Sequence, residues 1–141
     1  MIAPRREQGN AVVEAVLMFP ALLLLILAMI GAGRIVLAHA AVEAAARDAA
    51  RQASLARTPQ AAQQAARTSA SALLTSENLK CSPEVHIDTA GFAAPVGTPA
   101  TVSARVTCAV ALGDVAIPGL PGTKTIIATF TSPLDPFRGR N

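Results

Sequence analysis

Residues 5–34 have the sequence RREQGNAVVEAVLMFPALLLLILAMIGAGR, and this stretch decides how the chain is built. Its centre, residues 15–33, contains 19 consecutive residues without a charge, most of them Leu, Ile, Met and Ala. As an α-helix this run is about 28 Å long, close to the thickness of the hydrocarbon core of a bilayer. The sequence therefore predicts one membrane-spanning helix near the N-terminus.

The helical pattern continues beyond Arg34, because residues 35–56 contain neither Gly nor Pro and are rich in Ala. The helical period predicts an apolar face with Ile35, Val42, Ala45, Ala49 and Ala53, and a polar stripe with His39, Glu43, Arg47 and Arg51. We therefore expect a single helix over residues 10–57, with its first half in lipid and its second half in water. Pro20 lacks a backbone N–H, so it should kink or loosen the apolar half.

A second helix is expected over residues 58–79. Thr58 is a good N-cap residue, and Pro59 fits the first helical position. We expect this helix to fold back on the first one through Ala62, Ala66, Leu73 and their neighbours.

Residues 80–141 are expected to form a small β domain with an irregular tail, because Val, Thr, Pro and Gly dominate there. Strands are predicted over 85–89, 101–112 and 123–132, and in the middle one apolar and polar residues alternate. The inward face of that strand should carry Val102, Ala104, Val106, Cys108, Val110 and Leu112; in the third strand Ile126, Ala128 and Phe130 should share a face. The expected fold class is α+β: a long N-terminal helix, a second helix and a three-stranded antiparallel sheet.

Cys81 and Cys108 are the two cysteines of the chain. They lack a CxxC spacing and nearby histidines, so they are poor metal ligands. In an oxidising compartment we expect them to form one disulfide. Cys81 shares the parity of Val85 and Ile87, which makes a bridge to the inward face geometrically reasonable.

Several classes of function are disfavoured by the composition. The net charge is +3 and the pI about 9.5, but the positive residues are scattered and form no nucleic-acid-binding stripe. The acids are dispersed, and His39 and His86 are far apart in the sequence. Without a Ser/His/Asp grouping, a phosphate-binding Gly loop or metal-ligand spacing, we expect no enzyme, no cofactor, no metal ion and no small-molecule substrate.

The informative segment is GNAVVE, residues 9–14, between a basic leader and the apolar run. An ionised acid costs about 2.5–3.5 kcal/mol at the centre of a membrane helix and less near the interface. Glu14 is therefore either an ordinary flanking charge at the level of the headgroups or a residue with a partner. If the chain is cut after Gly9, Asn10 becomes the N-terminus. The free amine of a neighbouring copy can then pair with Glu14 inside an apolar bundle.

A short basic leader, Gly9, Glu14 and Pro20 within an apolar helix together resemble the class III signal of type IV pilin-like proteins. More narrowly, residues 5–34 are similar to the TadE-like family of the tight-adherence (Tad/Flp) pilus system. Major Flp pilins usually have Tyr after the Glu and end soon after the helix. This chain has Ala15 there and a further domain of about 85 residues after the long helix, so the similarity is to the minor, pseudopilin-like TadE type.

The resemblance implies that a prepilin peptidase removes a leader of residues 1–9 by cutting between Gly9 and Asn10. Glu14 would set the register between subunits, and Pro20 would let the helix bend on packing. The implied partners are the peptidase, other pilin and pseudopilin subunits, the Tad inner-membrane assembly platform and membrane lipid, without nucleic acid. The implied function is assembly of a Tad-type pilus in an adhesion or secretion apparatus.

The expected location is the cell membrane, crossed once, with a cytoplasmic N-terminus and an extracytoplasmic C-terminal domain, or the extracellular pilus. Charge counting alone does not decide this topology, because basic residues flank both ends of the apolar run. Two alternatives stay open. One is an uncut, membrane-tethered binding module of the cell envelope. The other is a small secreted protein released by a cut after Ala40, within the sequence Ala38-His39-Ala40.

Overall fold

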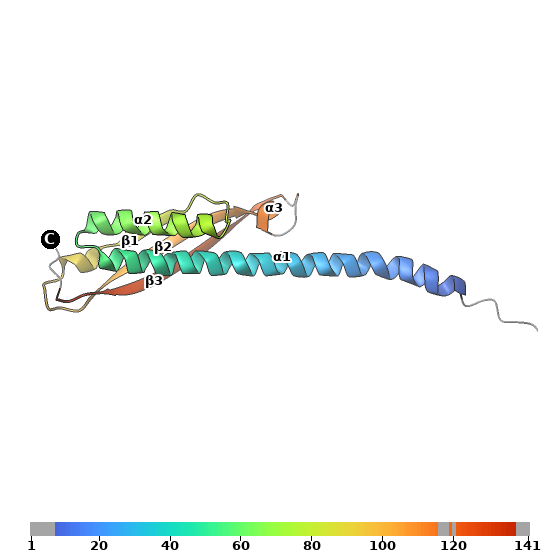
Figure 1. Cartoon of the computed structure of the whole chain (residues 1–141), viewed down its shortest axis with the longest axis horizontal. Helices are drawn as coiled ribbons and strands as arrows, with labels where there is room; N and C mark the ends of the chain where they lie inside the picture. Colours follow the sequence, from blue (N-terminus) through green and yellow to red (C-terminus); the bar gives the residue numbers. More distant parts are fainter. Residues whose placement is uncertain (1–7, 116–118, 120, 138–141) are drawn as a thin grey trace, which may run out of the picture.

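The computed structural model describes residues 8–115, 119 and 121–137. Its main feature is a long helix with a folded head at one end (Figure 1). Helix α1, Gln8–Leu55, runs along the whole molecule, and helix α2, Pro59–Ser76, lies antiparallel beside its C-terminal half. A three-stranded sheet packs against both helices. The structure thus confirms the predicted α+β fold, with a two-layer head of helices on a sheet.

The sheet is an antiparallel meander in the order β1-β2-β3. Its strands are β1, Glu84–Asp88, β2, Ala100–Ala111, and β3, Thr123–Leu134. A 3-10 helix, η1, Ala90–Ala93, lies between β1 and β2, and a one-turn helix, α3, Leu112–Val115, follows β2. The third strand extends two residues beyond its predicted end.

Alternation along β2 determines which face of the sheet packs on the helices. The side chains at every second position are buried: Val102, Ala104, Val106, Cys108 and Val110. The residues between them are exposed or half-buried, because the helices cover only one face. Leu112 was expected to continue this pattern, but it begins α3 instead and is half-buried.

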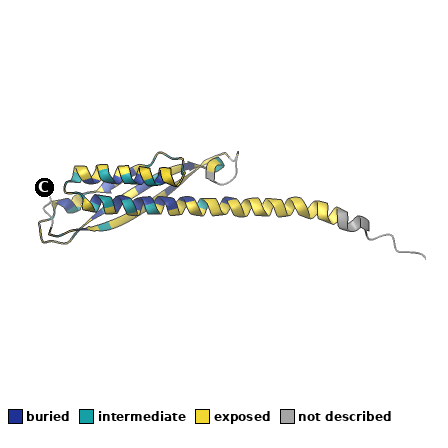
Figure 2. Cartoon of the chain, viewed as in Figure 1, coloured by how far each residue is buried: buried dark blue, intermediate teal, exposed yellow. Residues whose placement is uncertain are grey.

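Helix α1 has two halves with different surroundings (Figure 2). All residues from Val13 to Ile30 are exposed, and the exposed fractions of the large apolar side chains there run from 43% at Leu27 to 71% at Phe19. In the half beside α2 and the sheet, one face is buried and contains Ala38, Ala41, Val42, Ala45, Ala46, Ala49, Ala50 and Ala53. The predicted faces are confirmed, apart from Ile35, which is half-buried at the edge.

Local hydrogen bonds explain where α2 begins and ends. The Thr58 hydroxyl accepts a hydrogen bond from the Ala61 N–H at 3.2 Å, so Thr58 is the predicted N-cap. At the other end Asn78 has a left-handed φ of 55°, and the Leu79 N–H donates to the Leu74 carbonyl at 3.0 Å. This turn stops the helix at Ser76, three residues before the expected end. Leu74 is buried in the same row as Ala62 and Ala66, and its neighbour Leu73 is half-buried against the core.

Alanine is the main packing residue of the head. Of the 22 buried apolar residues that the structure describes, eleven are Ala, and both helices contribute to this set. Small side chains let helix backbones approach closely, so the interior has little space for larger ones. The core is therefore thin and depends on close contact between the layers.

Replacing Ala66 by Leu should destabilise the head, because Ala66 is fully buried on α2. Overpacking of this kind lowers the free energy of unfolding by about 1–3 kcal/mol. The matched control is Ala72→Leu, at an exposed position of the same helix, which should change it by no more than about 0.5 kcal/mol. Urea unfolding of the full chain in detergent, followed by circular dichroism, measures both. Equal effects of the two substitutions would contradict close packing between the layers.

Candidate functional site: the apolar half of α1 and its junction with the head

The predicted cleavage site lies at the N-terminal end of α1. Gly9 and Asn10 belong to the first turn of this helix, which begins at Gln8, and the structure describes their backbone. Residues 1–7 of the expected leader lie outside the described residues. The bond between Gly9 and Asn10 is therefore in the part of the helix where hydrogen bonding is weakest and ends fray.

Glu14 is exposed at the start of the apolar surface. It follows Asn10 by four residues, which places the two positions on the same side of the helix, one turn apart. Val13 and Val16 beside it are 59% and 65% exposed. A carboxylate thus stands at the border of a surface that is otherwise apolar on all sides, as in a helix that lies in lipid.

Pro20 lies inside α1 without interrupting it. Its missing N–H removes the hydrogen bond that the Val16 carbonyl would otherwise accept. Figure 1 shows the helix passing through this region as one continuous, gently curved ribbon. The bending of α1 at Pro20 when subunits pack together remains a prediction.

A disulfide joins Cys81, after α2, to Cys108 in the middle of β2. The two Cα atoms are 5.8 Å apart and 27 residues apart in the sequence. Cys108 is fully buried and Cys81 is half-buried, so the bond ties the segment after α2 to the interior of the sheet. It holds the end of the helical layer on the β layer.

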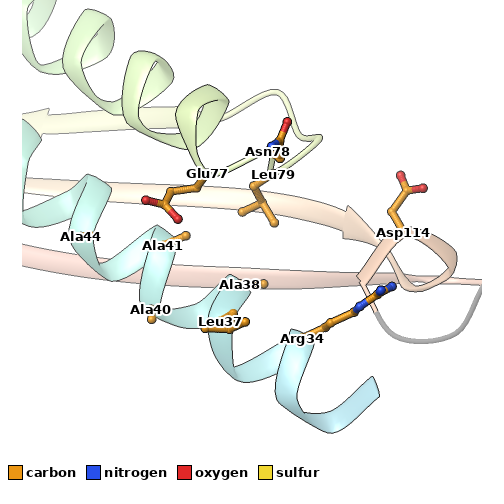
Figure 3. A pocket seen from close by; sticks show the side chains of 10 residues that line it. All are labelled: Arg34, Leu37, Ala38, Ala40, Ala41, Ala44, Glu77, Asn78, Leu79 and Asp114. Carbon is orange, nitrogen blue, oxygen red and sulfur yellow. The ribbon is translucent and has the colours of Figure 1, made fainter. Parts of the chain in front are cut away.

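An open pocket of about 480 Å³ lies where the apolar half of α1 meets the head. Figure 3 shows the side chains around it, which come from α1, the end of α2 and α3. Arg34, Glu77 and Asp114 are its charged residues. This site cannot be recognised in the sequence, because its residues lie far apart in the chain and only Arg34 borders the apolar run.

A second hollow, of about 320 Å³, lies beside β3. There the guanidinium carbon of Arg47 lies 5.3 Å from the centre of the Phe130 ring, a distance typical of a cation–π contact. Phe130 shares the inward face of β3 but is 39% exposed, since it lies at the outer strand of the sheet. Arg47 covers this edge of the core with its long side chain.

Metal binding finds no support in the part of the chain that the structure describes. Among those residues, no three His, Cys, Asp or Glu side chains gather as ligands would around a metal ion. His39 is on α1 and His86 is on β1, and both are exposed.

The described residues have the architecture of a single-anchor membrane protein. Helix α1 is long and apolar enough to cross a membrane, and it bears an α+β head at its C-terminal end. Residues 9–51 match the family model described as TadE-like protein, which confirms the resemblance that the sequence indicates. The match covers less than half of the chain, and a TadE-like domain over these residues suggests a Tad pilus-related protein. No curated protein and no solved structure gives a significant match.

Proposed function

We propose that this chain is a membrane-anchored minor pilin or pseudopilin that acts in the assembly of a Tad-type pilus. The observation that carries the proposal is the extent of the TadE-like match. It begins at Gly9, includes Glu14 and the exposed apolar half of α1, and continues into the half that packs on the head. The anchor, the proposed processing site and the stalk of the head are thus parts of one domain.

Before assembly, α1 holds the subunit in the membrane with the head on the extracytoplasmic side. A prepilin peptidase cuts the bond between Gly9 and Asn10, which lies in the first turn of the helix, where little helix has to be unwound. The cut leaves a free amine at the start of an apolar helix. The apolar surface of α1 then exchanges lipid for the helices of neighbouring subunits.

Glu14 provides the electrostatic part of this exchange. In an apolar bundle an unpaired carboxylate and an unpaired amine are both costly, whereas one pair between neighbouring copies removes both costs. Because the charges are fixed in position along each helix, this pairing sets the axial register between subunits.

The test is the intact mass and N-terminal sequence of the protein, purified from its native membrane without reducing agent. We expect the chain to begin at Asn10. A Gly9→Leu variant should keep its leader and begin at Met1, while Gly33→Ala, an exposed helical site with free space around it, serves as the matched control. A wild-type chain that begins at Met1 would remove the basis for pilin processing.

The secreted alternative predicts a chain that begins at Ala41. In the structure this cut lies in the middle of α1, between Ala38, which is 3% exposed, and Ala41, which is 8% exposed. It would therefore remove part of the helix that packs in the head. The uncut envelope module predicts a folded, membrane-bound chain that begins at Met1, and the same mass measurement distinguishes all three.

A further inference from the structure

The open pocket between α1, the end of α2 and α3 has a position relative to the membrane that follows from its place along α1. Arg34 is the first charged residue after the 19 uncharged residues 15–33. If that run spans the hydrocarbon core, as the proposed membrane anchorage requires, the guanidinium lies among the lipid headgroups on the side of the head. The inference below rests on this anchorage and on no other part of the proposed function.

The other two charges lie at opposite ends of the pocket: Asp114 is at the end near Arg34, and Glu77 is beside Ala41, farther from the apolar run. Glu77 follows the last residue of α2, and Asp114 lies in α3. Figure 3 shows Arg34 extending from α1 toward α3, while Glu77 lies above α1 on the other side of the pocket. All three side chains are exposed, and the apolar lining between them includes Leu37 and Leu79.

This charge pattern matches a zwitterion. A guanidinium binds a phosphate through two parallel hydrogen bonds, and a primary ammonium donates three hydrogen bonds that carboxylates accept. One cation and two carboxylates around a pocket of about 480 Å³ can therefore bind a phosphate and an ammonium at the same time.

Other headgroups fit less well. A quaternary choline nitrogen has no N–H to donate and is usually held by aromatic rings, and the pocket lining contains no aromatic residue. A glycerol headgroup carries the phosphate charge without an ammonium, so Glu77 and Asp114 would repel it. The ethanolamine headgroup meets both requirements.

We infer that this pocket binds the headgroup of a phosphatidylethanolamine molecule in the leaflet next to the head. The phosphate lies on Arg34, the ammonium extends from it into the pocket toward Glu77, and the apolar lining contacts the rest of the headgroup. The bound lipid fixes how far the head stands above the membrane.

Native mass spectrometry of the full, disulfide-bonded chain, released from micelles containing equal amounts of phosphatidylethanolamine and phosphatidylcholine, tests the inference. We expect one retained lipid, with a preference for phosphatidylethanolamine of about fivefold, since exposed charge pairs contribute up to about 1 kcal/mol. The double substitution Glu77→Gln and Asp114→Asn should remove this preference. Arg34→Gln should lower the retention of both lipids. Glu43→Gln, an exposed change elsewhere on α1, is the matched control and should behave like wild type.

Equal retention of the two lipids by the wild type would overturn the inference, as would a preference that survives the double substitution. A protein dimer that lipid does not compete away would place a second copy in the pocket and overturn it as well. Unfolding profiles of the variants confirm that their heads are intact. A lipid preference in a chain that begins at Met1 would leave this site standing while the pilin proposal fails. A chain that begins at Asn10 and shows no preference for phosphatidylethanolamine would overturn this site and leave the pilin proposal standing.

Discussion

A chain with Glu14→Gln should insert in the membrane and lose its leader like the wild type, and yet fail to enter pili. Glutamine keeps the size of the side chain and removes its charge, so the amine of the neighbouring Asn10 stays unpaired in an apolar bundle. Removing one partner of a buried pair costs about 3–5 kcal/mol, and we therefore expect incorporation to fall by about a hundredfold or more. Quantitative immunoblotting of sheared pili against the membrane fraction measures this ratio.

Glu43→Gln is the matched control for this experiment. It makes the same chemical change on the same helix, at an exposed position on the polar stripe of the half that packs in the head. We expect it to leave incorporation unchanged. If Glu14→Gln also left incorporation unchanged, Glu14 would be an ordinary charge at the level of the headgroups, and the register proposal would be wrong.

Removal of the disulfide should cause the largest loss of stability in the head. The bond between Cys81 and Cys108 closes a segment with a sequence separation of 27 residues. In the chain-entropy model a loop of this size stabilises the folded state by about 3.5 kcal/mol. The double substitution of both cysteines by Ala should lower the free energy of unfolding by about this amount, as measured by urea unfolding at equilibrium.

Reducing agent provides an independent control for the same bond. It should lower the unfolding midpoint of the wild type nearly to that of the double variant, and it should have no effect on the variant itself. A wild-type midpoint that does not respond to reduction would show that the thin core holds the head without help from the disulfide.

The sequence predicts well whatever depends on local periodicity. The run of 19 uncharged residues, the Ala-rich stripe that includes Ala45 and Ala49, and the alternation along β2 all appear as expected. Thr58 is the predicted N-cap, because capping needs only the residues of one helical turn. These features are encoded by neighbours in the chain, and so they can be found without knowledge of the fold.

Predictions at element ends were less accurate. Leu112 turns away from the sheet into α3, and α2 stops before Leu79 because Asn78 takes a left-handed conformation. Such choices depend on small free-energy differences, which packing against other elements can reverse.

Three features of this protein can be recognised without its fold: an apolar helix of membrane length, a similarity of residues 9–51 to the TadE-like family, and a mixed α+β head. By contrast, the shared pocket of Arg34, Glu77 and Asp114 at the membrane end of the head is visible only in the folded chain. The reason is physical. Periodicity along the chain shows which side of an element is apolar, but residues from α1, α2 and α3 meet only when the layers pack, and many weak contacts together determine that packing.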